Sequence, residues 1–67
     1  MPRMTLKDAR LRKGLTQDVL ASLSGVSQST VARIESGADA TVSVVERLEL
    51  ALGLRRGSLI IGRSAAA

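Results

Sequence analysis

The side chains best suited to chemistry in this sequence lie in the stretch QSTVARIES, residues 28–36. At the 100° spacing of a helix, Val31 and Ile34 share one face and point inward. The opposite face is short, polar and uncluttered, and it carries Gln28, Ser29, Ala32, Arg33 and Ser36. Amide and guanidinium groups form paired hydrogen bonds with adenine and guanine edges in the major groove of DNA. The stretch therefore favours a base-reading surface over the plainer alternative, an ordinary solvated helix face.

The residues that most often carry catalysis or hold metals are missing from the chain. It contains no His and no Cys, so it lacks the commonest metal ligand, the usual base at neutral pH and any thiolate. No glycine-rich loop suited to cradling phosphate is present. The acids Asp8, Asp18 and Glu35 fall on separate predicted helices. We therefore expect no enzyme activity, no cofactor and no metal site.

The chain of 67 residues has a formal net charge of +4, and its basic residues gather toward the N-terminus. Five of the ten Lys and Arg residues lie before Gly14, where the only acid is Asp8. Such a basic excess suits a polyanion such as nucleic acid, although small domains are also basic for solubility alone. No apolar run is long enough to span a bilayer, and no signal segment opens the chain. We expect a cytoplasmic protein that does not enter membranes.

Glycines and cap residues divide the sequence into five predicted helices. Four apolar-periodic segments are preceded by a residue whose hydroxyl can cap a helix, namely Thr5, Thr16, Ser27 and Thr41. Five segments are followed by the residue that most easily ends a helix, at Gly14, Gly25, Gly37, Gly53 and Gly62. The predicted helices span 6–13, 17–24, 28–36, 42–52 and 56–61, with Gly57 inside the last one. We expect an all-α fold with one domain over residues 1–62 and a tail at 63–67.

The second and third predicted helices are separated only by the tripeptide 24–26. So short a connection makes the two helices cross sharply. Either Val19 or Leu20 then packs against Val31 and Ile34 of the following helix. The pattern is that of a helix-turn-helix, in which the turn presents the outer face of the second helix rigidly.

Several short motifs occur together along the chain: Arg10, GLTQ at 14–17, LA at 20–21, GVS at 25–27, IESG at 34–37 and ALG at 51–53. In this combination, residues 5–62 resemble the phage-repressor/Cro (XRE-type) helix-turn-helix family of bacterial transcription regulators. The resemblance implies a five-helix, lambda-repressor-like DNA-binding domain. Its second and third helices would form the DNA-reading unit.

The resemblance also implies roles for individual residues. Base contacts would be made by Gln28, Ser29 and Arg33, and DNA-backbone contacts by Thr16, Gln17, Thr30, Thr41 and Ser43. Arg10 and Glu35 match an ion pair that ties the first helix to the end of the third. Residues 56–61 match the family's dimer contact, with Arg56, Leu59, Ile60 and Ile61 as candidates. Because three of these are consecutive apolar residues, a short helix cannot bury them all, and at least one is expected at the surface.

Several positions depart from the family's usual pattern, among them Arg55-Arg56-Gly57 at the start of the last predicted helix, where a cap and an acid are common. The loop at 39–43 is often basic, yet here it holds Asp39 and no Lys or Arg, which weakens any phosphate contact from it. Glu49 stands where alanine is usual, and Leu50 stands where a polar residue is usual. The fourth helix is therefore either rotated or offers Leu50 to a partner. Ser24 replaces a residue that is usually apolar.

These observations predict a sequence-specific regulator that binds double-stranded DNA. By resemblance it is a homodimeric repressor on a palindromic operator, encoded by a bacterium or a phage. The alternative is a protein-interaction module of the same fold, either an antitoxin that neutralises a toxin or an adaptor. Salt separates the two functions, because DNA binding weakens steeply with ionic strength whereas apolar protein contacts do not.

Overall fold

Each helix of the protein begins at the hydroxyl-bearing residue that the sequence predicts as its cap. The side-chain oxygens of Thr5, Thr16, Ser27 and Thr41 each accept a hydrogen bond from the backbone N–H three residues later, at 3.1, 3.1, 3.2 and 3.3 Å. These bonds satisfy amide groups that would otherwise have no partner at a helix start. The four predicted N-termini are confirmed.

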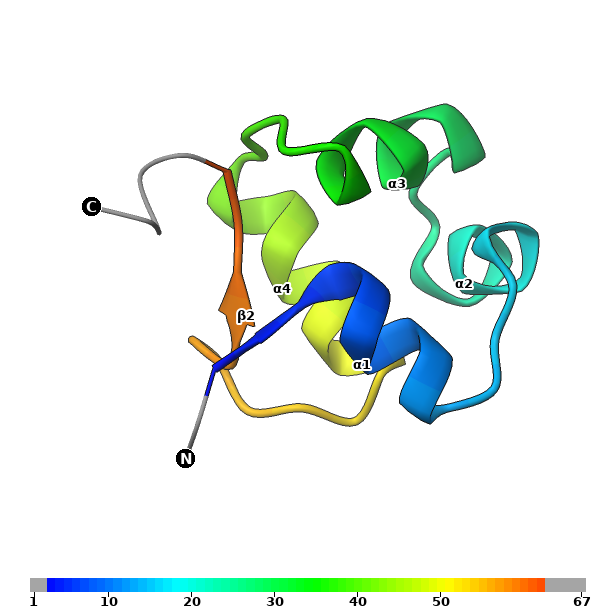
Figure 1. Cartoon of the computed structure of the whole chain (residues 1–67), viewed down its shortest axis with the longest axis horizontal. Helices are drawn as coiled ribbons and strands as arrows, with labels where there is room; N and C mark the ends of the chain where they lie inside the picture. The colour runs from blue at the N-terminus through cyan, green and yellow to red at the C-terminus, as the bar shows by residue number, and fades with distance from the viewer. Residues whose placement is uncertain (1–2, 63–67) are drawn as a thin grey trace.

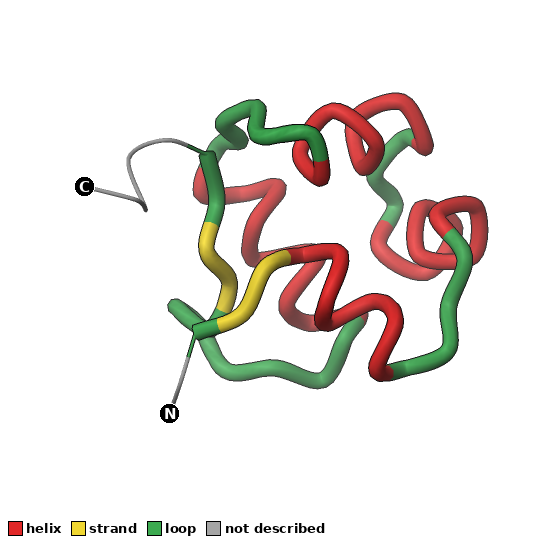
Figure 2. The backbone as a smooth tube through the Cα atoms, in the orientation of Figure 1, coloured by secondary structure: helices red, strands yellow, loops and turns green. Residues whose placement is uncertain are grey.

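The computed structural model describes residues 3–62, and four helices make up most of it (Figure 1). They are α1 (Leu6–Arg12), α2 (Gln17–Ser24), α3 (Gln28–Glu35) and α4 (Val42–Ala51). Two short strands, β1 (Met4–Thr5) and β2 (Leu59–Ile60), lie side by side at one end of the molecule (Figure 2). The predicted tail, 63–67, lies outside the described residues. Within residues 3–62, no helix has the length and apolar character needed to cross a membrane.

The predicted fifth helix at 56–61 is wrong. The chain makes a turn after α4 and then enters β2, which pairs in parallel with β1 so that Met4 faces Leu59. Gly57 has φ of +84°, a left-handed conformation that no α-helix contains. The Oε2 atom of Glu49 accepts the backbone N–H groups of Gly57 and Leu59 at 2.9 and 3.3 Å, which holds this segment in its extended path. The described residues thus form four helices and a small sheet.

The core is aliphatic and draws on every helix. Its most deeply buried side chains are Leu6, Leu20, Val31, Leu48 and Leu52, each no more than 2% exposed. Leu59 adds an apolar side chain from β2, so the strand closes the core where a fifth helix was expected. Burial of these aliphatic side chains supplies the main driving force for folding. The chain has no disulfide and no aromatic residue that could add to it.

Candidate nucleic-acid interface

The turn between α2 and α3 brings the two helices together as the sequence predicts (Figure 1). Leu20, Val31 and Ile34 are buried at the junction, whereas Val19 is 44% exposed. Leu20 is therefore the residue of α2 that faces α3. Gly25 ends α2 with φ of +73°, and its N–H donates to the carbonyl of Ala21. The left-handed glycine lets the chain reverse direction within the few residues available.

Ser24 fixes this turn through its hydroxyl group. The Oγ atom donates to the carbonyl oxygen of Leu20 at 2.8 Å and accepts the backbone N–H of Val26 at 3.3 Å. The side chain thereby bonds to backbone groups on both sides of Gly25. A serine here replaces apolar packing with hydrogen bonds to the turn, which accounts for the departure from the family's usual residue.

The outer face of α3 is exposed and polar. The side chains of Gln28, Ser29, Arg33 and Ser36 are all exposed. Arg33 and Ser36, with Ala32 and Ala38, also line a shallow hollow. Thr30 is half-buried, and its hydroxyl accepts a hydrogen bond from Ser27 Oγ at 2.8 Å. The structure therefore brings the three predicted base-contacting residues together on one accessible helix.

Arg10 and Glu35 form the predicted ion pair. Arg10 Nε donates to Glu35 Oε2 at 2.6 Å, and Arg10 Nη2 donates to Glu35 Oε1 at 3.0 Å. A third bond runs from Arg10 Nη1 to the carbonyl oxygen of Leu15 at 2.8 Å. The two side chains are only 11% and 6% exposed, so the pair joins α1, the loop before α2 and the end of α3 away from water.

The pKa shifts of Arg10 and Glu35 both favour the charged form of the side chain. The hydrogen bond to Glu35 raises the pKa of Arg10 above its usual value, against an opposing effect of desolvation. Desolvation by itself favours the neutral form of Glu35, but the hydrogen bonds from Arg10 and Gln17 outweigh it and lower the pKa of this carboxyl. The charges of Arg10 and Lys7 act in the same direction. Glu35 is therefore a carboxylate at neutral pH.

Gln17 belongs to the same network, which the sequence did not indicate. Its Nε2 atom donates to Glu35 Oε1 at 3.1 Å, so the first residue of α2 is bonded to the last residue of α3. An amide group has two N–H donors and one oxygen acceptor. One donor is thus used within the protein, and the second N–H is available to donate to a phosphate group.

The other predicted backbone contacts cluster at helix starts. Thr16 and Thr41 are exposed caps whose oxygens accept backbone N–H groups, and each keeps its hydroxyl hydrogen as a donor. Ser43 is exposed in the first turn of α4. Asp39 is also exposed, in the loop between α3 and α4. These positions present neutral donors and one negative charge.

The predicted dimer residues differ in how far they are exposed. Leu59 is 6% exposed and belongs to the core, because β2 turns its side chain inward. Ile60 and Ile61 are half-buried, and Arg56 is highly exposed in the turn before β2. The folded chain therefore does not offer Leu59 to a partner. Among residues 3–62, no cluster of acidic side chains is arranged to hold a metal ion.

The sequence profile of the helix-turn-helix family matches residues 6–59. The match runs from the start of α1 to the first residue of β2 and covers most of the chain. The protein is therefore a helix-turn-helix protein, and it belongs to the XRE/Cro-type family of DNA-binding transcription regulators. Comparison with curated proteins and with solved structures gave no match.

Proposed function

We propose that the protein binds palindromic double-stranded DNA as a homodimer, reads base edges with α3 and represses transcription in the bacterial cytoplasm. The exposed polar face of α3, fixed to α1 and α2 by the network of Arg10, Gln17 and Glu35, carries this proposal. A recognition helix must hold its side chains in register with the bases. A buried network at the end of α3 supplies that rigidity.

Arg33 and Gln28 are the groups that select bases. The guanidinium of Arg33 engages O6 and N7 of a guanine, and the amide of Gln28 engages N6 and N7 of an adenine. Ser29 lies between them on the exposed face and donates or accepts a single hydrogen bond. Such contacts specify sequence, whereas contacts to phosphates only position the protein.

Positioning falls to residues in the first turns of the helices. Phosphate oxygens accept hydrogen bonds from residues of three helices: Thr16 and Gln17 at α2, Thr30 on α3, and Thr41 and Ser43 at α4. The backbone amides at the start of α2 add a partial positive charge that favours an anion there. Bound at an operator, the dimer blocks access of RNA polymerase and so represses.

Selection of binding sites from random duplex DNA tests the proposal directly. We expect a palindromic consensus whose half-sites lie about one turn of DNA apart, or about 34–36 Å. Enrichment of a non-palindromic site would contradict a symmetric dimer. A complete lack of enrichment, with binding that is also insensitive to salt, would contradict DNA recognition itself.

The second candidate function is protein binding, as an antitoxin or an adaptor of the same fold. Two exposed leucines favour it, because Leu50 and Leu23 are 82% and 60% exposed. Single exposed leucines are common, but Leu50 also lines a groove, which gives a partner protein a concave surface to contact. Binding that persists from low to high salt would favour this function over DNA binding.

A further inference from the structure

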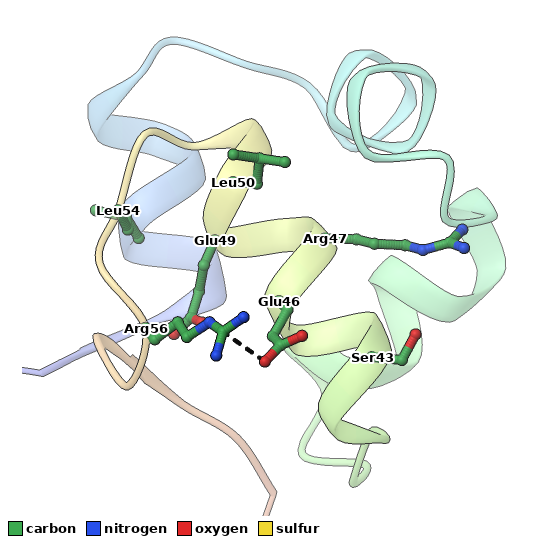
Figure 3. Close-up of a pocket in the computed structure, with 7 residues that line it drawn as sticks. All are labelled: Ser43, Glu46, Arg47, Glu49, Leu50, Leu54 and Arg56. Carbon is green, nitrogen blue, oxygen red and sulfur yellow. Dashed lines mark ion pairs between the residues drawn. The ribbon is translucent and has the colours of Figure 1, made fainter.

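The outer face of α4 forms a groove with a leucine at its centre. The groove is lined by residues of α4 and of the following turn, namely Ser43, Glu46, Arg47, Glu49, Leu50, Leu54 and Arg56 (Figure 3); we name these seven residues the α4 groove. Leu50 is 82% exposed, the highest value among the large apolar side chains of residues 3–62. Leu54 beside it is half-buried and packs on the core. The α4 groove therefore has an exposed apolar centre on a well-packed base.

The charges around Leu50 are of both signs. Glu46 and Arg56 form an ion pair at 3.4 Å, and their side chains are 39% and 83% exposed. Figure 3 shows Arg56 reaching back toward Glu46 from the turn after α4. An ion pair so open to water contributes little to the fold, and either partner is free to exchange. A surface with both charges complements a second copy of itself when the two-fold axis places each charge opposite the other sign.

The alternative dimer surface, the edge of β2, is partly closed. The N–H of Leu59 already donates to Glu49, and the side chain of Leu59 is buried. An added strand would need that N–H as a donor. A partner strand would therefore have to displace a buried carboxylate, whereas the α4 groove is open.

We infer that the α4 groove is the homodimer surface and that its occupant is the α4 groove of a second copy of this chain. The two-fold axis passes beside Leu50, which packs on Leu50 of the partner subunit. The two α4 helices run antiparallel across this axis. Residues one turn before Leu50 in one protomer therefore face the residues after Leu50 in the partner subunit. Glu46 of each protomer then pairs with Arg56 of the partner subunit, and the internal pair is exchanged for two reciprocal ones.

This arrangement rests on the proposed dimeric function and fits the predicted DNA surface. The α4 groove begins at Ser43, in the first turn of the helix whose N-terminus is proposed to lie along the DNA backbone. A partner seated in the groove is therefore placed beside the same DNA face. Contact through α4 thus joins the two recognition helices without a fifth helix.

Analytical ultracentrifugation of Leu50→Asp tests the apolar centre. The chain has no aromatic residue, so the measurement uses interference optics. We expect the dimer dissociation constant to rise at least about tenfold, because the substitution places two carboxylates against each other. Leu11→Asp is the matched control, since Leu11 is 55% exposed on α1 and lies outside the groove. Its dissociation constant is expected to stay within about twofold of the native value, with native far-ultraviolet circular dichroism for both variants.

Mixing two charge variants tests the reciprocal pairs. Glu46→Arg alone and Arg56→Glu alone each place like charges across the contact, so each variant is expected to self-associate at least about tenfold more weakly. An equimolar mixture restores opposite charges at both pairs of the mixed dimer and is expected to recover dimer formation. An ion pair that stays within one chain cannot be rescued by mixing.

Two outcomes separate this inference from the proposed function. If the native protein remains a monomer both free and on the selected DNA, the proposed homodimer fails and the role of the α4 groove fails with it. If the native protein is a dimer on palindromic DNA, but Leu50→Asp dimerises normally or the mixture stays monomeric, only the α4 groove is overturned.

Discussion

Arg33 is the residue on which sequence specificity is expected to depend. It is exposed on α3, and among residues 3–62 no ion pair engages its guanidinium. Arg33→Ala is expected to relax the base preference at one symmetric pair of positions, at a cost of about 1–3 kcal/mol for the preferred base. Arg33→Lys keeps the charge without the fork, so it should recover non-specific binding better than specificity. Fluorescence-anisotropy titrations on operators with single base changes measure both; an equal loss for every site would make Arg33 a phosphate contact.

Gln17 is expected to contribute affinity without specificity. Its amide donates one N–H to Glu35, which leaves the second N–H to donate to a phosphate group. Gln17→Met preserves the length of the side chain and removes these hydrogen bonds, so binding should weaken about equally on all sequences. Because the same change breaks the bond to Glu35, thermal unfolding of the free protein is the necessary control. A loss confined to particular base pairs would show instead that Gln17 reads bases.

The carboxylate of Glu35 is expected to be the most sensitive polar position for stability. Removing one partner of a buried ion pair leaves the other unpaired and costs about 3–5 kcal/mol, so Glu35→Ala should be largely unfolded or melt far below the native protein. Glu35→Gln keeps an oxygen that accepts from Arg10 and should lose less. Thermal circular dichroism compares the three proteins; a melting temperature unchanged in Glu35→Ala would refute the role of the pair.

The same carboxylate predicts how stability depends on pH. Its pKa is lower in the folded protein than the ordinary value of 4.5, so the folded state binds this proton less readily than the unfolded state. The resulting stabilisation is fully present above pH 4.5 and is lost as the pH falls through the lowered value. Glu35→Gln should therefore show a flatter stability profile than the native protein in this acidic range. Parallel profiles would mean that Glu35 titrates normally.

At the scale of the elements, the sequence predicted the four helices because local signals agreed with one another. Each helix has a hydroxyl cap before it and apolar residues at helical spacing within it. These signals act over a few residues and do not depend on the rest of the fold. The ion pair of Arg10 and Glu35 was accessible only through resemblance to a family, since 25 residues separate the two. The base-contacting roles stay predictions.

The end of the chain could not be predicted in this way because a distant side chain determines it. Glu49 on α4 binds two backbone N–H groups of the segment that follows, and this tertiary contact overrides the apolar pattern of residues 56–61. Gly57 was the one local sign against a helix. Glu49 is buried, whereas Leu50 beside it is exposed. The position that is usually polar in the family therefore still faces outward on α4, although here it is a leucine.

Glu49 is therefore expected to hold the sheet to the helices. Glu49→Ala leaves the N–H groups of Gly57 and Leu59 without their acceptor, and the buried N–H of Leu59 alone should cost about 1–3 kcal/mol. Glu46→Ala is the matched control, because Glu46 makes only an exposed ion pair and should change stability by about 0–1 kcal/mol. Chemical denaturation at low protein concentration compares the two. Equal stability of both variants would show that Glu49 does not anchor β2.

At the scale of the whole molecule, the positive charge is less available to DNA than its total suggests. Of the ten Lys and Arg residues, Arg10 lies in the interior paired with Glu35, so its charge is not available to a phosphate group. The proposed backbone contacts are neutral amides and hydroxyls, and the loop beside α4 carries Asp39. The salt dependence of DNA binding should therefore come from the exposed cations, such as Arg33, and not from the residues proposed to contact the DNA backbone.

The salt dependence of DNA binding by Asp39→Lys is expected to show how many protomers bind one DNA site. A new cation in the loop between α3 and α4 adds one phosphate contact per protomer, which steepens the slope of log K against log salt by about 0.9 for a monomer and about 1.8 for a dimer. Affinity should rise on every sequence alike, because a phosphate contact carries no base information. Asp39→Asn is the isosteric control: it preserves the close contact of this side chain with Gly62 and removes the negative charge without adding a cation. Salt titrations of the native protein and both variants on the selected operator measure the slopes. A slope for Asp39→Lys equal to that of Asp39→Asn would place this loop away from the DNA backbone.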